Sequence, residues 1–418
     1  MNKQRLAIIG GGISGLTSAY LLRRDFDISV FEANDYIGGH TNTVEVEHSG
    51  KTYQIDTGFI VCNDRNYQNF LELMSALDVD LQPSEMSFSV KNNLLDLEYN
   101  GHNLNTLFSQ RRNFLRPAFY RLVYDILKFN RAAKKSLAGY PDKQITLREF
   151  VQGEKLSAIF IDNYLMPMVA AIWSCSLEQA EEFPLKFFLR FFLNHGLLDV
   201  KNRPQWYVLT GGSKSYVVPM TSAFKENITV SCPVASVSRK QDFLEVHHAN
   251  GVEKFDQVIF ACHSDQALNL LESPTQDEKN ILQNLPYQEN DVTLHTDISL
   301  MPNRKLAWAS WNFLAGERKT SDPPIVTYCM NILQGIQSEV PFLVSLNARS
   351  KIDPKKILRE FKYSHPVYSE GALQAQARRF EISGADRIHY CGAYWYSGFH
   401  EDGVRSALDV ANHLGAET

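Results

Sequence analysis

The sequence predicts an α/β protein in which a domain built on parallel strands is interrupted by an inserted α+β domain. Three observations lead to this prediction. The chain has 418 residues, enough for two or three domains. A strand, a glycine-rich turn and a helix open the chain, and a second strand–glycine–helix unit closes it. The segments between these units carry the alternating and helical patterns of both strands and helices.

Composition places the chain among ordinary globular proteins, with 44% hydrophobic and 21% charged residues. The net charge of −5 provides no basic excess for a phosphate backbone, so no nucleic-acid partner is expected. The six cysteines are scattered without ligand spacing, which predicts free thiols in a reducing compartment and no metal. The apolar run at 6–22 is interrupted by ordered glycines, which argues against a secretory signal and favours a cytoplasmic protein.

The first element is a short buried strand at 6–9, followed by the spacing GxGxxG at 10–15 and a helix. Gly10 permits the tight turn, Gly12 lets a pyrophosphate approach the backbone, and Gly15 lets the helix pack closely on the strand. The N-terminus of the helix offers free N–H groups to the phosphates. A second strand ends at Glu32, where a carboxylate can accept the hydroxyls of a ribose. The unit therefore predicts a Rossmann-like dinucleotide site.

Two further segments follow in order. The first runs from Glu32 and Ala33 to the pair Gly38-Gly39 and His40. A hairpin is expected at 43–55, and the second segment, 56–60, follows it directly. Together they resemble the FAD-binding start of the flavin amine oxidase superfamily, which includes amine oxidases, protoporphyrinogen oxidase and phytoene-type desaturases. The resemblance implies FAD rather than NAD. Family members usually carry Arg where this chain has His40.

The last element is a strand at 387–391 ending at Gly392, an aromatic loop, and a helix from Val404 onward. It resembles the closing FAD motif of the same superfamily, although Asp402 stands where the family usually has Gly. The resemblance implies a non-covalent flavin, because Cys391 should face the core. Taken over both ends and the middle of the chain, the residues expected to bind FAD are Gly10, Gly12, Ile13, Ser14, Gly15, Glu32, Ala33, Gly38, Gly39, His40, Thr41, Gly58, Phe59, Ile60, Val234, Ala261, Gly392, Phe399, Asp402, Gly403 and Val404.

The FAD-binding domain is thus expected to be discontinuous, over 1–82, 205–285 and 384–418, with the substrate domain formed by 83–204 and 286–383. Segments along the whole chain, such as 170–174, 308–312 and 363–367, resemble a narrower bacterial group. That group comprises FAD-dependent amine-oxidase-like proteins found beside cyclopropane-fatty-acid synthases.

The expected substrate is apolar. Amine oxidases place a Lys on the strand expected after Pro286, and this chain has no Lys between Lys279 and Lys305. We expect Lys305 at the surface. The resemblance then implies an oxidoreductase in which flavin N5 accepts a hydride during desaturation or oxidation of a fatty acyl or lipid-like molecule. The alternatives are an amine oxidase producing peroxide, a non-redox flavoprotein, and a flavin-stabilised partner of a lipid-modifying enzyme.

His400 and His295 are the candidate acid–base residues, and each has a structural role as its alternative. The helix with the Phe-rich run 187–193 is interpreted as a buried helix, with an acyl-channel wall or a face touching the inner side of a membrane as the alternative. Segment 105–137 is expected to be a helical, solvated surface. The aromatic residues expected to line a substrate pocket are Trp308, Trp311, Trp395, Tyr396 and Phe399.

Overall fold

A five-stranded sheet carries both ends of the chain. The computed structural model describes residues 3–139, 145–199, 201–315 and 322–416. In the strand order β10-β2-β1-β14-β20, every neighbouring pair is parallel. The two central strands are buried almost throughout, which explains their continuous apolar sequences. The strands are β1 Arg5–Ile9, β2 Asp27–Phe31, β10 Ile228–Thr229, β14 Gln257–Phe260 and β20 Ile388–Tyr390.

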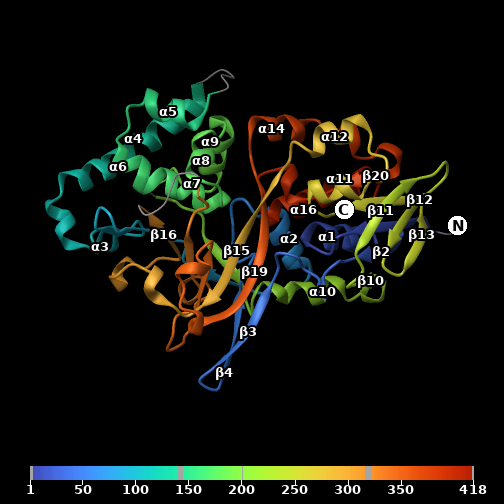
Figure 1. Cartoon of the computed structure of the whole chain (residues 1–418), viewed down its shortest axis with the longest axis horizontal. Helices are drawn as coiled ribbons and strands as arrows, with labels where there is room; N and C mark the ends of the chain where they lie inside the picture. Colours follow the sequence, from blue (N-terminus) through green and yellow to red (C-terminus); the bar gives the residue numbers. More distant parts are fainter. Residues whose placement is uncertain (1–2, 140–144, 200, 316–321, 417–418) are drawn as a thin grey trace.

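Helices from the two ends of the chain pack against each other beside this sheet. Helix α1 (Ile13–Leu22) follows β1, and helix α16 (His400–His413) is the last element of the chain. The two helices lie side by side in Figure 1, close to α2. Further helices that accompany this part are α2 Gln68–Ala76, α10 Val217–Thr221, α11 Ser264–Leu270, α12 Gln276–Leu282, α14 Glu370–Ala377 and α15 Arg379–Ile382.

Three small antiparallel sheets border the parallel one. The hairpin expected at 43–55 is present as β3 (Thr43–His48) with β4 (Lys51–Asp56), and Val234 begins the three-stranded sheet β11-β12-β13. The third sheet has the order β5-β9-β6. Its strands and those of the second sheet are β5 Cys62–Asn63, β6 Leu81–Ser84, β9 Trp206–Leu209, β11 Val234–Arg239, β12 Leu244–His248 and β13 Gly251–Phe255.

A seven-stranded sheet forms the other lobe, in the order β19-β15-β18-β17-β16-β7-β8. Strands β15 and β19 pair over their whole lengths, from Tyr287 opposite Pro366 to His295 opposite Ile357. Figure 1 shows these two long strands reaching from this lobe toward the parallel sheet. The strands are β7 Phe88–Asn92, β8 Leu97–Asn100, β15 Tyr287–His295, β16 Trp311–Ala315, β17 Val326–Cys329, β18 Leu343–Leu346 and β19 Ile357–Pro366.

A helical layer completes this lobe and shares the largest apolar cluster with the sheet. The segment 105–137, expected to be helical, contains more than one helical element. A short helix and a tight turn come first, and the long helix begins at Pro117, because proline fits the first turn of a helix but not its interior. In the described residues, no helix is long and apolar enough to span a membrane. The helices are α3 Leu104–Leu107, α4 Pro117–Gly139, α5 Leu147–Gly153, α6 Ala158–Phe160, α7 Met166–Trp173, α8 Leu177–Glu181, α9 Leu185–Asn194 and, beside β17, α13 Met330–Leu333.

Candidate functional site

The turn between β1 and α1 leaves the N-terminus of the helix open. Gly10 has a φ of +111°, which favours glycine, and a Cβ there would lie 2.7 Å from the carbonyl oxygen of Ala261. A Cβ on Gly15 would lie 2.0 Å from the oxygen of Gly10, so helix and turn are in tight contact. A Cβ on Gly12, by contrast, would meet nothing within 4 Å. Since no side chain caps this helix, its first N–H groups are suited to bind an anion.

The second glycine loop rests on this turn. The Gly38 N–H donates to the oxygen of Gly11 at 2.8 Å, and a Cβ on Gly39 would lie 3.2 Å from the Cα of Gly12. Glu32 is buried, and its carboxylate accepts the N–H of Gly11 at 2.7 Å and that of Asn34 at 2.8 Å. The carboxylate of Glu32, which is expected to bind a ribose, therefore also holds the glycine turn in place.

Two other segments named from sequence lie at this place. The N–H of Phe59 donates to the oxygen of His40 at 2.7 Å, and a Cβ on Gly58 would lie 2.1 Å from the same oxygen. The N–H of Cys232 donates to the backbone carbonyl oxygen of Glu32 at 2.8 Å. This bond brings Val234, at the start of β11, to the end of β2. Ala33 is exposed, whereas Ile60 is buried in the apolar cluster of the other lobe.

The closing motif meets the opening one directly. A Cβ on Gly403 would lie 2.7 Å from the Cγ2 of Ile13 and 3.8 Å from the N of Ser14. Val404 packs in one cluster with Ile13. The N–H of Gly392 donates to Ser406 at 2.8 Å, so the end of β20 is fixed to α16. The segments separated by nearly the whole sequence thus form a single site.

Asp402 is committed to the loop that precedes α16. Its Oδ2 accepts the N–H of Phe399 at 2.9 Å and that of Ser397 at 3.1 Å. Burial raises the pKa of this carboxyl to about 7. Asp402 therefore holds the aromatic loop in place from the third position of α16, where its side chain accepts the N–H of the N-cap residue Phe399 as in a capping box.

The two candidate acid–base histidines are both buried and hydrogen-bonded within the protein. His400 lies beside the glycine loop, with its Nε2 3.0 Å from the hydroxyls of Thr41 and Tyr216. Burial lowers its pKa to about 3. His295 lies at the far end of β15, where its Nδ1 accepts the N–H of Asp297 and its Nε2 lies 2.8 Å from Ser345. The structure thus separates the two residues and gives His295 a partner on each ring nitrogen.

His40, which was expected to bind FAD, forms a pair with His365, a residue that the sequence interpretation did not include in the site. The ring centroid of His40 is 4.9 Å from that of Tyr363 and 5.6 Å from that of His365. The Nδ1 of His365 lies 3.1 Å from the hydroxyl of Ser174. The Nε2 of His40 is buried without a hydrogen-bond partner among the described residues. Segments 170–174 and 363–367 stood out in the sequence, but nothing local indicated that they meet at His40.

Burial sets the protonation of this pair. It lowers the pKa of His365 to about 4 and that of His40 well below its ordinary value, with a smaller contribution from His263 to both. Both rings are therefore neutral near pH 7. A neutral ring keeps one nitrogen as a donor and the other as an acceptor, so the pair can hold or pass a proton.

The expected aromatic wall does not form a single cluster. Trp308 packs with Met301, and Trp311 begins β16 at the seven-stranded sheet. Trp395 and Tyr396 instead belong to the cluster under the parallel sheet, where the Tyr396 hydroxyl donates to Asp409 at 2.5 Å. These four residues therefore lie in three different places of the structure.

Phe399 alone of the expected wall joins the two lobes. Its ring stacks on that of Phe191 of α9, with centroids 5.1 Å apart. Phe191 also lies 4.6 Å from Trp173, and the neighbouring Phe187 stacks on Tyr368 at 4.9 Å. The Trp173 Nε1 and the Tyr368 hydroxyl are buried without partners in the described part of the chain. An aromatic surface from α7, α9 and the end of β19 thus faces the closing motif.

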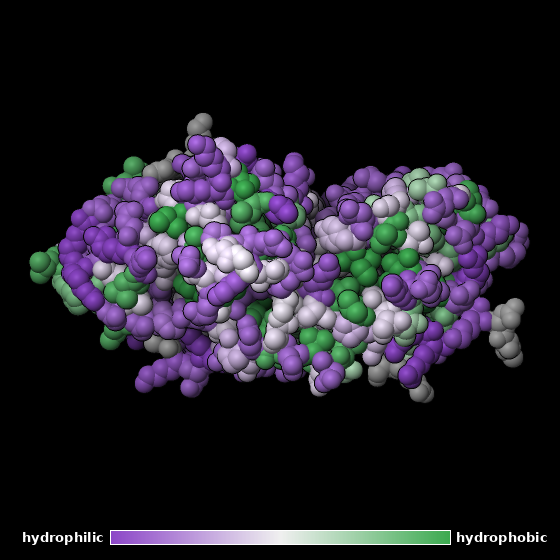
Figure 2. All heavy atoms as spheres, turned by 90° about the horizontal axis from the view of Figure 1, so that it is seen from below, coloured by the Kyte–Doolittle hydropathy of each residue, from purple (hydrophilic) through white to green (hydrophobic). Residues whose placement is uncertain are grey.

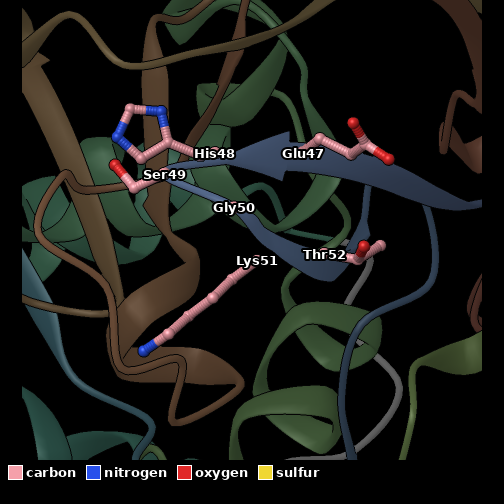
Figure 3. Close-up of a pocket in the computed structure, with 6 residues that line it drawn as sticks. All are labelled: Glu47, His48, Ser49, Gly50, Lys51 and Thr52. Carbon is pink, nitrogen blue, oxygen red and sulfur yellow. The ribbon is translucent and has the colours of Figure 1, made fainter.

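Other polar groups that could define a site lie elsewhere. The pocket in Figure 3 is lined only by the turn of the β3–β4 hairpin, residues 47–52, and contains none of the expected site residues. Lys305 is exposed, as expected.

Within the described ranges, no group of three or more His, Cys, Asp and Glu side chains is arranged to hold a metal ion. A non-redox flavoprotein that binds a diphosphate sugar would need a cluster of arginines. Arg111, Arg112, Arg116 and Arg121 instead bond to Asn105, Asp96 and Asp125 in the α3–α4 region.

Comparison with known proteins yields one family and a set of structural likenesses. The family model described as flavin containing amine oxidoreductase matches residues 13–330. Among curated proteins, the chain is 52% identical over 44 residues to flavin-containing amine oxidase A of Canis lupus familiaris, covering 10% of this chain and 8% of that protein. It is 39% identical over 51 residues to the 4,4'-diaponeurosporene oxygenase of Staphylococcus haemolyticus, covering 12% and 10%. These matches span about a tenth of the length of either relative.

Solved structures resemble the chain over its whole length. The cyclohexylamine oxidase from Brevibacterium oxydans has a TM-score of 0.69 at 14% identity, covering 99% of this chain and all of the other. A putrescine oxidase variant has a TM-score of 0.70 at 14% identity, covering 99% and 98%. A fatty acid isomerase from P. acnes has a TM-score of 0.69 at 13% identity, covering 98% of both chains. At these identities, the likeness concerns the fold.

Proposed function

The chain belongs to the flavin containing amine oxidoreductase family, whose members are oxidoreductases that bind FAD, and we propose that it oxidises or desaturates an apolar, fatty acyl or lipid-like molecule. The proposal includes a Rossmann-like FAD-binding domain over 1–82, 205–285 and 384–418. The inserted pieces, 83–204 and 286–383, would form an α+β substrate domain.

The residues present fit the cofactor. The open N-terminus of α1 and the space beside Gly12 suit a pyrophosphate, and Glu32 and Val234 lie together where a ribose and an adenine would be held. The buried, unpartnered Nε2 of His40 supplies a polar atom that nothing in the described protein uses. In place of the family's usual Arg, this neutral ring would contact the cofactor without adding a fixed charge.

Bound FAD would supply the two-electron acceptor for the reaction. The chain's own contribution is to bind, orient and exclude water. His365 is held at Nδ1 by the Ser174 hydroxyl and by the Asn290 amide, which donates to it, so the neutral ring carries its proton on Nε2 and can hold or donate it there. Phe399, held by Asp402, would place an apolar ring at the entrance to the site.

One observation carries the substrate class, namely the aromatic surface of Trp173, Phe187, Phe191 and Tyr368 against Phe399. Each such ring buries roughly 150–250 Å² of surface, far more apolar area than a small amine requires. The histidines facing this region are neutral, which also suits an uncharged chain.

The cofactor site can be tested by a matched pair of substitutions. Gly12→Ala adds a methyl group into space that the protein leaves open, at a φ of −78° that alanine adopts freely. Gly153→Ala makes the same addition into open space at the end of α5. We expect Gly12→Ala to fold but to purify with at least ten-fold less FAD, while Gly153→Ala retains it. FAD at wild-type stoichiometry in Gly12→Ala would refute this placement of the pyrophosphate.

The substrate class can be tested by comparing total lipids of a deletion strain and its complemented parent by mass spectrometry. A two-dalton difference in one acyl species is the expected result. Identical lipids, together with flavin that no acyl lipid reduces under anaerobic conditions, would defeat the proposal.

An amine oxidase is the second candidate, because stacked aromatic rings such as Phe191 and Phe399 can also hold an ammonium group by cation–π contact. The structural likeness to two amine oxidases raises the same candidate by analogy alone. Rapid peroxide formation from a panel of monoamines and polyamines would favour it over the lipid proposal.

A further inference from the structure

Exposed apolar side chains are concentrated on one end of the molecule. Of the fifteen large apolar side chains that are exposed in the described part of the chain, eight lie between residues 94 and 127. The exposed fractions of Leu115, Leu104 and Leu94 reach 87%, 77% and 74%. Figure 2 shows apolar atoms at this end of the molecule, where Figure 1 places α3 and α4. We call this set the apolar end surface; it comprises Leu94, Leu95, Leu104, Phe114, Leu115, Tyr120, Tyr124 and Leu127.

Contacts between the segments make this a single surface. Arg112 and Arg116 both donate to the oxygen of Asp96, which ties the turn between β7 and β8 to the turn before α4. The Tyr120 hydroxyl donates to the oxygen of Phe114 at 3.1 Å, and Arg111 donates to Asn105 of α3 at 2.7 Å. The exposed side chains therefore keep fixed relative positions.

Basic residues surround the apolar ones. Residues 94–139 contain eight Arg and Lys but three Asp and Glu, in a chain whose net charge is −5. Two of the three acids, Glu98 and Asp125, are buried and engage Arg304 and Arg121. On α4, the exposed positions Tyr120, Tyr124 and Leu127 are followed at helical spacing by Arg131 and Lys135, which are also exposed. One face of the helix is thus apolar in its first half and basic in its second.

We propose that the apolar end surface docks on a bilayer containing anionic phospholipid. Apolar side chains this exposed are costly in water and mark a surface that is covered in use. Leucines and aromatics that enter the boundary between headgroups and acyl chains, with a basic rim on the headgroups, are the features of a protein that lies on a membrane. The Phe-rich helix α9, the other candidate for this contact, buries Phe188, Phe191 and Phe192 and so presents no such face.

The docking surface connects to the candidate site through one apolar body. The inner face of α4 buries Phe119, Leu122 and Phe129, and the Phe129 ring lies 6.3 Å from that of Phe188 of α9. The next turn of α9 carries Phe191, the ring stacked on Phe399. The inference goes beyond the proposed function and does not depend on it. The two are compatible, because a protein docked on a membrane could take an acyl chain from it as substrate.

Vesicle flotation tests the proposal with the purified full-length flavoprotein. We expect it to float with phosphatidylcholine vesicles containing 30% phosphatidylglycerol and to remain at the bottom with phosphatidylcholine alone. Leu104→Asp with Leu115→Asp should reduce the floated fraction at least ten-fold, because charged side chains cannot enter the bilayer boundary. The control is Val252→Asp in β13, a residue that is also exposed, at 55%, but lies at the opposite end of the molecule, and it should float like wild type.

A second variant separates charge from apolar insertion. Arg131→Glu with Lys135→Glu should weaken flotation several-fold, and the remaining binding should become less sensitive to salt. Each variant should keep the flavin absorbance of the wild type, which shows that it is folded. A variant that lost its flavin would bear on the proposed FAD site and not on the docking of this surface. Failure of wild type to float, equal flotation of Leu104→Asp/Leu115→Asp, or a wild-type dimer that this variant dissociates would overturn the proposal.

Discussion

The rings of Phe59 and His400 lie face to face, with centroids 3.8 Å apart and 5° between their planes. Phe59 belongs to the segment after the first hairpin, and His400 is the first residue of the last helix. Their stack, with the hydrogen bonds of Thr41 and Tyr216 to the same imidazole, holds the opening and closing motifs together.

The Tyr216 hydroxyl is the central hydrogen-bonding group of this junction. It lies 2.5 Å from the Thr41 hydroxyl and 3.0 Å from His400 Nε2, and its side chain is fully buried. Tyr216→Phe should lower the free energy of unfolding by about 1–2 kcal/mol, because two buried partners lose a hydrogen bond. Tyr124→Phe, at a position 59% exposed, is the control and should change it by less than about 0.5 kcal/mol. Equal urea midpoints for the two variants would contradict the role of Tyr216.

Asp402 should respond differently to two substitutions. Asp402→Ala removes the acceptor of the Phe399 and Ser397 N–H groups and should cost about 1 kcal/mol of stability. Asp402→Asn keeps an oxygen there and removes a buried charge. Since burial raises the pKa of Asp402 to about 7, the wild type holds this charge at pH 8 but largely not at pH 5. Thermal unfolding should therefore find Asp402→Asn at least as stable as wild type at pH 8, an advantage that shrinks at pH 5.

The stability of the whole protein should fall between pH 7 and pH 5. Burial holds the pKa of five histidines at about 3 to 4, so below pH 6.5 the unfolded chain binds protons that the native state does not. Two carboxyls, Asp56 and Asp402, have pKa values raised by burial to about 6 and about 7, and they act in the opposite direction. Each group contributes at most about 1.4 kcal/mol per pH unit. The five histidines are His195, His295, His365, His389 and His400.

The pKa values of His40 and His263 are also lowered and that of Asp162 is also raised, so seven histidines oppose three carboxyls and the urea midpoint should be lower at pH 5 than at pH 7. The measurement belongs at about 0.2 M salt, where interactions between surface charges are screened. A midpoint that rises toward pH 5 would show that these histidines are not buried as the structure has them.

The flavin should be held without a covalent bond. Cys391 precedes Gly392 but is fully buried, with its sulfur 3.6 Å from the Ser18 hydroxyl. Burial raises its pKa to about 11, so it lacks the thiolate that a covalent attachment needs. Acid precipitation should leave a yellow supernatant, and Cys391→Ser should purify with as much flavin as wild type. Yellow colour that stays with the precipitated wild type but not with Cys391→Ser would contradict this.

Local sequence was sufficient for the elements that carry the FAD motifs. The turn at Gly10 needs a positive φ, and the spacing from Gly10 to Gly15 lets a helix pack on its own strand, so nearest neighbours in the chain define both. Hairpins such as β3–β4 are equally local, because alternation and a short turn fix their register. The family resemblance, which rests on these same motifs, was confirmed by the match over 13–330.

The tertiary structure alone decided which side chains meet. His40 and His365 come together because β15 and β19 extend from one lobe onto the glycine loop of the other. The pairing of β15 with β18 gives the Nε2 of His295 its partner Ser345, whereas the partner of its Nδ1, Asp297, is local in sequence. Periodicity shows that a helix has an apolar face but not what covers it. Hence the face of α9 is covered by Trp173 and Phe399, and that of α4 at Tyr120 and Tyr124 is left exposed.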